Sequence, residues 1–271
     1  MRPRGATQPD PRRYEPMRVS FASATDKGLR RSTNEDNLAV RDDLGLFVVA
    51  DGMGGHAAGE VASQAAIDGI VAFAEATVSV SPDQTWPIPF NPNQSVNANR
   101  LDAGFRMADR RIAAEAAAST ELRGMATTAV AALITDSVVT LAHVGDSRVY
   151  RLHQGQLEQL TRDHSWVEEQ IRAGTLTESA ARAHPWRNIV TRALSGSEEL
   201  EVDIRELSLE PGDRLLLCSD GVFAVLTDDQ IGEVLQQHAD LDAVCHALIK
   251  GANDGGGPDN VTAVVLEVHA G

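Results

Sequence analysis

Four aspartates of this chain share one local context, an apolar run adjoining a small or turn-forming residue. They are Asp51 in FVVADG, Asp146 in LAHVGDS, Asp220 in LLLCSDG and Asp259 in GGGPDN, the last just before VTAVVLEV. An acidic pair, Glu35-Asp36, lies close to Arg31 in RRSTNED. One Asp-Gly alone is a weak signal, because that dipeptide is also a favoured turn. Five acidic sites of this kind predict carboxylates that converge at one edge of a sheet structure.

Converging carboxylates repel one another unless a cation joins them. Hard divalent cations such as Mg²⁺ and Mn²⁺ prefer oxygen ligands, so the pattern predicts a cluster of these ions. Zinc is disfavoured, because the chain has no HExxH and no CxxC, and its eight histidines are scattered. Gly52, directly after Asp51, would let a backbone carbonyl approach the same ions.

The sequence lacks the residues that other phosphate-binding and hydrolytic motifs require. GMGGHAAGE lacks the Lys of a P-loop and the last glycine of a dinucleotide-binding loop. Neither Cys218 nor Cys245 has an Arg six positions later, as a cysteine-based phosphatase would need, and no GxSxG elbow occurs. Both cysteines lie in apolar contexts, which predicts buried free thiols in a reducing cytoplasm.

The elements that must position these residues follow from periodicity and turn signals. Residues 44–50, LGLFVVA, are nearly all apolar, as in a strand buried on both faces. Asp203 and Asp213 fit the solvated ends of strands. We expect one α+β domain over residues 17–271, after a disordered leader over 1–16 that leaves Met1 or Met17 as the natural start. The other predicted strands are 17–24, 37–40, 200–209, 213–218, 260–268 and several within 126–160; the predicted helices are 58–77, 95–118, 165–173, 177–183, 228–236 and 240–252, and 79–94 is a loop.

Composition limits the partners. The net charge of −15 argues against nucleic acid. The longest apolar stretch, residues 126–144, is interrupted by Thr135-Asp136-Ser137, so no membrane span is expected, and the N-terminus lacks an apolar signal core. We therefore expect a cytoplasmic protein, and a monomer.

The order of motifs resembles that of the metal-dependent protein phosphatases of type 2C, the PPM family, in its bacterial branch. The resemblance runs from about residue 18 to residue 268. It implies a β-sandwich of two antiparallel sheets flanked by helices, a four-layer αββα arrangement with metals at one end. The motifs that carry it are GLRRSTNEDN, VVADGMGGHAAGEVAS, GMATTAVAAL, AHVGDSRVYRL, LTRDHS, HPWRNIVTRALSG, DRLLLCSDGV and GGGPDNVTAVV.

The resemblance also implies a site. Asp51 would bridge two Mn²⁺ or Mg²⁺ ions, the Gly52 carbonyl would complete one of them, and Asp220 and Asp259 would hold the other, so that Asp51 and Asp220 are the catalytic carboxylates. The remaining implied roles are Glu35 and Asp36 acting through metal-bound waters, Asp146 with Asp220 at a third metal to which Asn188 lends an oxygen, and Arg31 gripping the substrate phosphate beside a flap over residues 161–195.

The implied reaction is hydrolysis of phosphoserine and phosphothreonine on proteins, Ser/Thr protein kinases among them, by direct attack of a metal-bridging water. Two cations can lower the pKa of that water and neutralise charge on the phosphate. Eukaryotic members carry a histidine where this chain has Met53, so the group that protonates the leaving oxygen is open. His56, His164, His184 and a metal-bound water are the candidates.

Two other functions stay open at this point. A pseudophosphatase would bind a kinase or phosphoprotein without turnover, and loss of a metal carboxylate would reveal it. A developmental regulator would use the same fold as a partner-switching phosphatase, usually with an added sensory or membrane domain.

Overall fold

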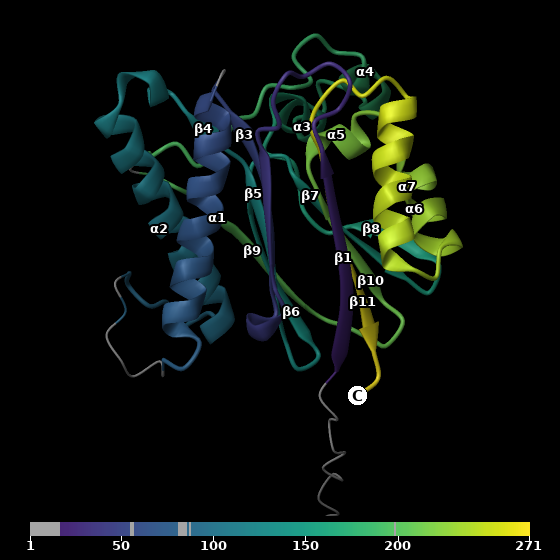
Figure 1. Ribbon diagram of the computed structural model, residues 1–271, viewed down its shortest axis with the longest axis horizontal. Coiled ribbons are helices and arrows are strands. Elements are labelled where there is room, and N and C mark those ends of the chain that lie inside the picture. Colours follow the sequence, from purple (N-terminus) through teal and green to yellow (C-terminus); the bar gives the residue numbers. More distant parts are fainter. Residues whose placement is uncertain (1–16, 55–56, 81–85, 87, 198) are drawn as a thin grey trace, which may run out of the picture.

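The structure is a computed structural model that describes residues 17–54, 57–80, 86, 88–197 and 199–271. Two antiparallel sheets face each other, and a pair of long helices covers each outer surface, which makes four layers (Figure 1). The αββα sandwich predicted from the sequence is thereby confirmed. The predicted leader over 1–16 lies outside the described residues.

Each sheet contains strands from both halves of the chain, and every strand pair in them is antiparallel. The first has the order β1 (Arg18–Asp26), β11 (Val261–His269), β10 (Arg214–Cys218), β7 (Arg148–His153) and β8 (Gln156–Gln159). The second has the order β2 (Asp36–Arg41), β3 (Leu46–Met53), β5 (Ala129–Thr135), β6 (Val138–Val144) and β9 (Asp203–Ser208), with β4 (Ala126–Thr127) paired to β3.

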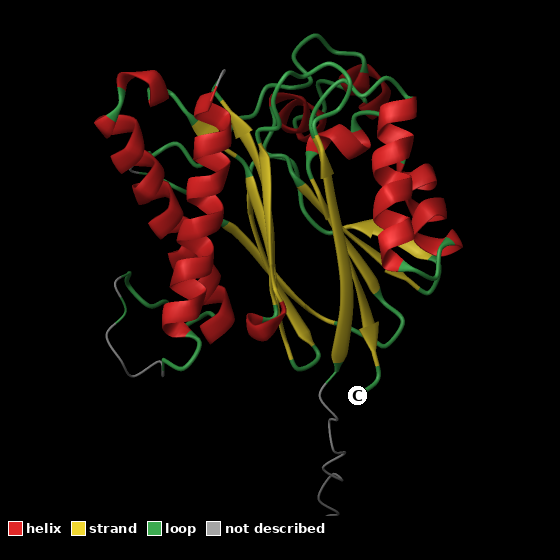
Figure 2. Cartoon of the chain, in the orientation of Figure 1, coloured by secondary structure: helices red, strands yellow, loops and turns green. Residues whose placement is uncertain are grey.

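Helices α1 (Ala57–Thr77) and α2 (Val96–Ala118) pack on the second sheet, and α6 (Asp228–Gln237) and α7 (Leu241–Asp254) pack on the first (Figure 2). Three short helices lie at one end of the sandwich (Figure 1): α3 (Trp166–Arg172), α4 (Glu178–Arg182) and α5 (Asp220–Phe223). The 3₁₀ turns are η1 (Asp42–Leu44) and η2 (Thr120–Leu122).

Strand β3 is buried on both faces, which explains its continuous apolar sequence. Leu46 and Val48 point to the α1–α2 layer, whereas Phe47 and Val49 point into the core between the two sheets. All four side chains are at most 1% exposed. Alternating side chains of one strand therefore contribute to two separate cores, as expected for a central strand of a layered fold.

The antiparallel pairing brings strand ends to one edge of the sandwich. The start of β2 lies opposite the end of β3, with Asp36 paired to Asp51. The end of β10 lies opposite the start of β11, with Cys218 paired to Ala263. The residues that follow β10 and precede β11 are therefore neighbours at that same end of the molecule.

The predicted element boundaries agree closely, with two instructive differences. Strand β3 continues through Asp51 to Met53, because Gly52 and Met53 pair with β4. Asp220 begins α5, a four-residue helix that no periodic pattern predicted. So short an element contains too few residues to show a helical period. The 79–94 loop lies partly outside the described residues.

Candidate active site

Asp36 and Asp51 form the centre of an acidic cluster between the two sheets. Their strands hold them face to face, and Asp36 is only 5% exposed. The Ser219 hydroxyl donates to Asp36 Oδ2 at 2.7 Å, while Asp36 Oδ1 is buried without a hydrogen-bond partner in the described part of the chain. The Asp51 backbone is tied to β4 and the residue after it, since its carbonyl accepts from the Thr128 N–H at 2.9 Å and the Thr127 hydroxyl at 2.8 Å.

Asp220 and Asp259 bring two more carboxylates from the other sheet. Asp220 follows the end of β10, and its Oδ1 is also buried without a partner among the described residues. Asp259 precedes β11; its Oδ1 accepts from the Asn260 N–H at 2.8 Å and its Oδ2 from Arg31 Nη2 at 2.6 Å. Arg31 is half exposed, so it brings a cation to the rim of the cluster rather than to its centre.

The pKa values show how poorly these charges are compensated. Burial first, and then the neighbouring carboxylates, raise the pKa of Asp51 and of Asp220 well above the usual range. Burial also raises the pKa of Asp36 to about 6, although hydrogen bonds from Thr262 and Ser219 oppose the shift. Such a group of acids is short of compensating positive charge, which a bound cation would supply.

Asp146 belongs to the same electrostatic cluster. It is 8% exposed, and burial, followed by the charge of Asp163, raises its pKa to about 6. Asp163 itself pairs with Arg148, whose Nε and Nη2 donate to its two oxygens at 2.9 and 2.7 Å. The Arg148 guanidinium also lies 3.7 Å from the ring centre of Phe223, the last residue of α5. A partly buried cation thus connects the Asp146 turn with the helix that begins at Asp220.

Gly52 and Gly59 allow α1 to approach the cluster closely. A Cβ on Gly52 would lie 2.0 Å from the Gly59 carbonyl oxygen, and one on Gly59 would lie 2.7 Å from the Glu35 carboxyl carbon. The Gly52 N–H donates to the Glu35 carbonyl at 3.2 Å. The sequence suggested that Gly52 is bare so that its carbonyl can reach a metal. The structure adds a different reason, which is contact with the first turn of α1.

The remaining predicted residues lie apart from this cluster. Asn188 is in an exposed turn, and within the described residues no hydrogen bond joins its side chain to the acidic group, so its predicted role stays a prediction. His184 packs against Trp166 in a tilted arrangement with ring centres 4.8 Å apart, and its Nδ1 accepts from the Trp186 backbone N–H. His56 lies outside the described residues.

His164 is buried and joins His143 and Asp203 in a group that the sequence had scattered over sixty residues. The two rings stack with centres 4.6 Å apart, and His164 Nε2 lies 3.3 Å from Asp203 Oδ2. His164 Nδ1 accepts from the Gly145 N–H at 3.1 Å. A neutral imidazole that accepts at Nδ1 carries its proton on Nε2, which has no lone pair for a metal and, although close to Asp203, makes no hydrogen bond among the described residues.

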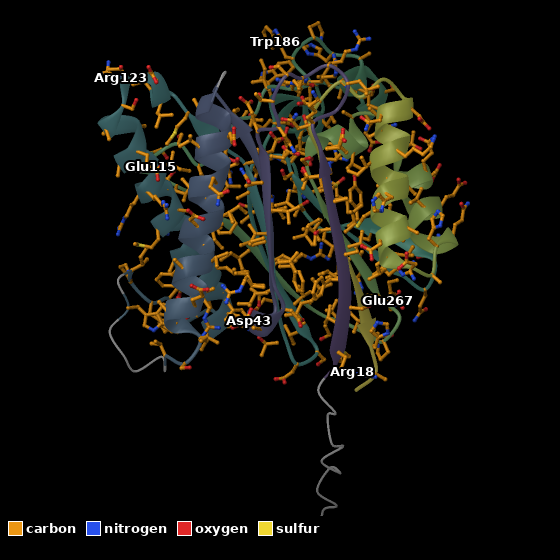
Figure 3. The ribbon with its side chains drawn as sticks, viewed as in Figure 1. Arg18, Asp43, Glu115, Arg123, Trp186 and Glu267 are labelled. Carbon is orange, nitrogen blue, oxygen red and sulfur yellow. The ribbon has the colours of Figure 1, made fainter. Side chains whose placement is uncertain are left out.

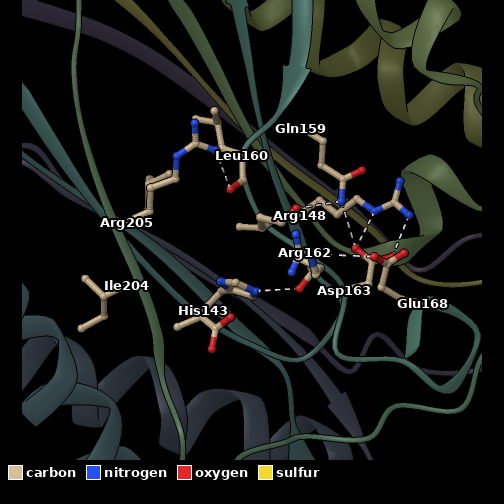
Figure 4. Close-up of a pocket in the computed structure, with 12 residues that line it drawn as sticks. His143, Arg148, Gln159, Leu160, Arg162, Asp163, Glu168, Ile204 and Arg205 are labelled. Atoms are coloured by element: carbon tan, nitrogen blue, oxygen red, sulfur yellow. Dashed lines mark hydrogen bonds and ion pairs between the residues drawn. The ribbon is translucent and has the colours of Figure 1, made fainter. Parts of the chain in front are cut away.

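A cavity of about 500 Å³ opens beside this group, and His143 and Asp203 line it (Figure 4). Its charged walls are largely paired inside the protein. Arg148 holds Asp163, and Arg205 donates to the Leu160 carbonyl and to Glu158. The cavity therefore lacks the uncompensated charge that distinguishes the acidic cluster.

Two residues that shape the site were not predicted from the sequence: Ser219 and Asn260. Each acts on a residue far along the chain, as Ser219 does on Asp36. Their only sequence signal is position, since each lies within two residues of a strand-end aspartate.

The donor set of the cluster fits a hard divalent cation. Its atoms are carboxylate oxygens, and two of them, on Asp36 and Asp220, are buried without a partner in the described residues. Mg²⁺ and Mn²⁺ favour such oxygen ligands. Unpaired buried carboxylates are costly, and a cation is the natural complement.

Comparison with known proteins agrees with the motif order. A family model described as Protein phosphatase 2C matches residues 28–254. This chain belongs to that family. It is 40% identical over 250 residues to the serine/threonine protein phosphatase PstP of Mycobacterium tuberculosis, and the match covers 92% of this chain but 45% of that relative, so the chain spans about half of its length. It is 37% identical to the serine/threonine phosphatase stp of Listeria monocytogenes, over 90% of this chain and 93% of the relative.

Solved structures show the same family fold. The Mycobacterium tuberculosis serine/threonine phosphatase PstP/Ppp superposes with a TM-score of 0.82 at 37% identity, covering 93% of this chain and 99% of that one. The catalytic domain of PstP in complex with two manganese ions gives a TM-score of 0.79, also at 37% identity, over 93% and 98% of the two chains. Among the described residues of our phosphatase 2C chain, no helix has the length and apolarity to cross a membrane.

Proposed function

We propose that this phosphatase 2C chain is a metal-dependent protein serine/threonine phosphatase that hydrolyses phosphoserine and phosphothreonine on proteins. The observation that carries the proposal is the convergence of five aspartates from two sheets, where the half-exposed Arg31 pairs with Asp259 and Arg148 is engaged with Asp163. Names of relatives support the activity, since both PstP and stp are called serine/threonine phosphatases. The two manganese ions of the PstP complex support the cofactor, Mn²⁺ or Mg²⁺.

We further propose that Asp51, the Gly52 carbonyl, Asp220 and Asp259 hold the two ions, with Asp36 and Glu35 contributing through water. Asp146 and Asn188 are proposed for a third ion. When bound, such ions act as Lewis acids that lower the pKa of water and neutralise charge on the phosphate. Asp51 and Asp220 are the proposed catalytic carboxylates, because burial and the neighbouring carboxylates raise the pKa of both, which favours a cation beside them.

The chain's own residues contribute positioning and charge. Arg31 Nη2 is engaged with Asp259, and the half-exposed guanidinium has further N–H groups that can donate to phosphate oxygens. Ser219 orients Asp36 through its 2.7 Å hydrogen bond. Direct attack by water agrees with the state of the cysteines. Burial raises the pKa of Cys245 to about 12 and that of Cys218 further, so neither offers a thiolate for a phosphoenzyme.

Phosphorylated proteins are the proposed partners, Ser/Thr protein kinases among them, and a monomer is the proposed state. We assign the phosphatase domain to residues 17–271 and a flap to residues 161–195, which include α3 and α4. Trp186 of that segment lies at the end of the sandwich where the short helices gather, far from Arg18 and Glu267 (Figure 3). A flap at that end would lie beside the substrate.

The test is phosphate release from a phosphothreonine peptide with Mn²⁺, with and without a chelator. We expect activity that requires the metal and is lost in Asp51→Ala. Turnover that survives complete metal removal, or that survives Asp51→Ala, would contradict the proposal. Binding of the peptide without turnover in the Mn²⁺-loaded wild type would instead indicate a pseudophosphatase.

A further inference from the structure

The loop over residues 27–35, between β1 and β2, carries Arg31 and Glu35 but is held mainly from outside itself. The N–H groups of Leu29 and Arg30 both donate to the Gly257 carbonyl, at 2.9 and 3.1 Å. Gly28 has φ +74°, and a Cβ there would lie 2.1 Å from the Asp259 carbonyl oxygen. The turn before β11 therefore supports the loop along its first half.

One side chain, that of Asn260, joins both ends of this loop. Its Nδ2 donates to the Lys27 and Thr33 carbonyls, each at 2.9 Å, and its Oδ1 accepts from the Glu35 N–H at 2.8 Å. Asn260 is only 5% exposed. Both N–H donors and the carbonyl of the amide are thus used on a loop that lies more than 220 residues earlier in the chain.

The same residue also connects the loop to the acidic cluster. The Asn260 backbone N–H donates to Asp259 Oδ1, and Asp259 Oδ2 accepts from Arg31. Because the Arg31 side chain is half exposed, packing alone does not define its position. The backbone that carries Arg31 and the carboxylate that it contacts are both set by residue 260.

We propose that Asn260 is a positioning residue for phosphate binding: its amide fixes the 27–35 loop so that Arg31 is held beside Asp259, ready to receive a substrate phosphate. The inference rests on the proposed phosphatase function and deepens it. Arg31 makes the contact with phosphate, and Asn260 acts through the loop.

Asn260→Ala and Asn260→Asp test this together. Aspartate keeps the size of the side chain and so preserves packing, but it has no N–H donors for the two carbonyls. Alanine removes the bonds without adding charge to the acidic cluster, so agreement between the variants excludes a purely electrostatic effect. Loss of buried hydrogen bonds that order the loop predicts a rise of about tenfold in KM for the phosphopeptide and in the inhibition constant of inorganic phosphate. We expect kcat to stay within about threefold, since Asp51 and Asp220 are untouched.

Asn99, in the first turn of α2, offers a matched control. It is also 5% exposed, its Nδ2 donates to the Asn91 and Ser95 carbonyls at 2.9 Å each, and its Oδ1 accepts from the Asn91 N–H. Asn99→Ala should lower the melting temperature about as much as Asn260→Ala, because similar buried bonds are lost. It should leave KM and the phosphate inhibition constant within twofold.

Hydrogen exchange separates this inference from the proposed activity. We expect faster amide exchange over residues 27–35 in the Asn260 variants and unchanged exchange there in Asn99→Ala, whether or not the protein turns over a phosphopeptide. In an Arg31→Ala background, Asn260→Ala should add less than about twofold to KM, because coupled residues are non-additive. The inference is overturned if the Asn260 variants match Asn99→Ala in KM, or if loop exchange is unchanged. A wild type without activity but with Asn260-dependent loop exchange would defeat the function and keep the positioning role of Asn260.

Discussion

The two ends of the sandwich hold buried aspartates in opposite electrostatic states. At the end with the short helices, Asp36, Asp51, Asp146 and Asp220 have raised pKa values. At the other end, Asp213 is 2% exposed, although the sequence predicted a solvated strand end there, which is wrong. Burial opposes the charged form of Asp213, but the Glu210 N–H, Arg151 and His153 outweigh it and hold its pKa below the usual range.

The two groups of aspartates differ in the hydrogen-bond donors and cations that contact their carboxylates. Asp213 accepts from Arg151 Nε at 3.0 Å, from the Glu210 N–H at 2.8 Å, and pairs with His153 Nδ1 at 2.6 Å. The carboxylates of the acidic cluster share Arg31 and a few hydroxyl groups. A carboxylate removed from water thus becomes part of an ion pair where the chain provides its own cations, and a proposed cation ligand where it does not.

Asp220→Asn should have the largest effect and would sharpen this contrast. The amide removes a charge from the cluster, and we expect kcat to fall by at least about 10³-fold, the scale of lost electrostatic stabilisation in an active site. The increase in melting temperature caused by Mn²⁺ should disappear as well. Phosphopeptide kinetics and thermal unfolding with and without Mn²⁺ measure both effects. A variant with full activity would mean that the acidic cluster is not the catalytic centre.

Asp213→Asn should instead affect stability. It leaves Arg151 and His153 without their carboxylate, which in a buried pair costs about 3 kcal/mol of unfolding free energy. Urea unfolding measures the loss, and Mn²⁺-dependent kcat at a temperature where the variant is folded serves as the control. We expect kcat within twofold of wild type; an equal loss of catalysis would break the distinction between the two ends.

Arg31→Ala compared with Arg30→Ala tests the cation at the rim. A charge-assisted hydrogen bond to phosphate contributes about 1.5–3 kcal/mol, so kcat/KM should fall by about 10- to 100-fold in Arg31→Ala. Arg30 is an exposed neighbour and provides the matched loss of one positive charge. If both variants lose activity equally, long-range attraction of the phosphate would account for the effect, without a specific contact.

The pH dependence of the unfolding free energy in a chelator tests the raised pKa values of the acidic cluster. In the unfolded chain an Asp titrates near 3.9, and in the fold Asp36 and Asp146 titrate at about 6. Between these values the native state binds more protons, so its stability falls as pH rises, by about 1.4 kcal/mol per pH unit for each carboxyl. Asp36→Asn should reduce the slope, and Mn²⁺ should restore stability above pH 6. A flat profile in the chelator would contradict the raised pKa values.

The acidic cluster could be predicted, because its aspartates share a recognisable local sequence context. Asp51 and Asp220 each follow an apolar run and precede a glycine, and antiparallel pairing sets the end of each strand beside the start of its neighbour. The layered fold followed from the same runs and from the resemblance to the PPM family.

What escaped prediction depends on contacts between distant residues. Asp213 resembles any aspartate at a strand start, and only the fold brings Arg151 and His153 to it. The stacking of His143 on His164 and the hydrogen bonds from Asn260 to the 27–35 loop likewise have no local sequence pattern. A side-chain hydrogen bond across two hundred residues leaves no periodic signal in one sequence.

Anomalous diffraction at the manganese edge, from crystals grown with Mn²⁺, would locate the metal ions directly. We expect at least two peaks within coordination distance of Asp51, Asp220 and Asp259, with no peak beside Asp213 or between His143 and His164. Their loss in Asp51→Asn crystals would confirm that the carboxylate holds the ions. Absence of manganese at the acidic cluster, or its presence at the histidine pair instead, would contradict the account.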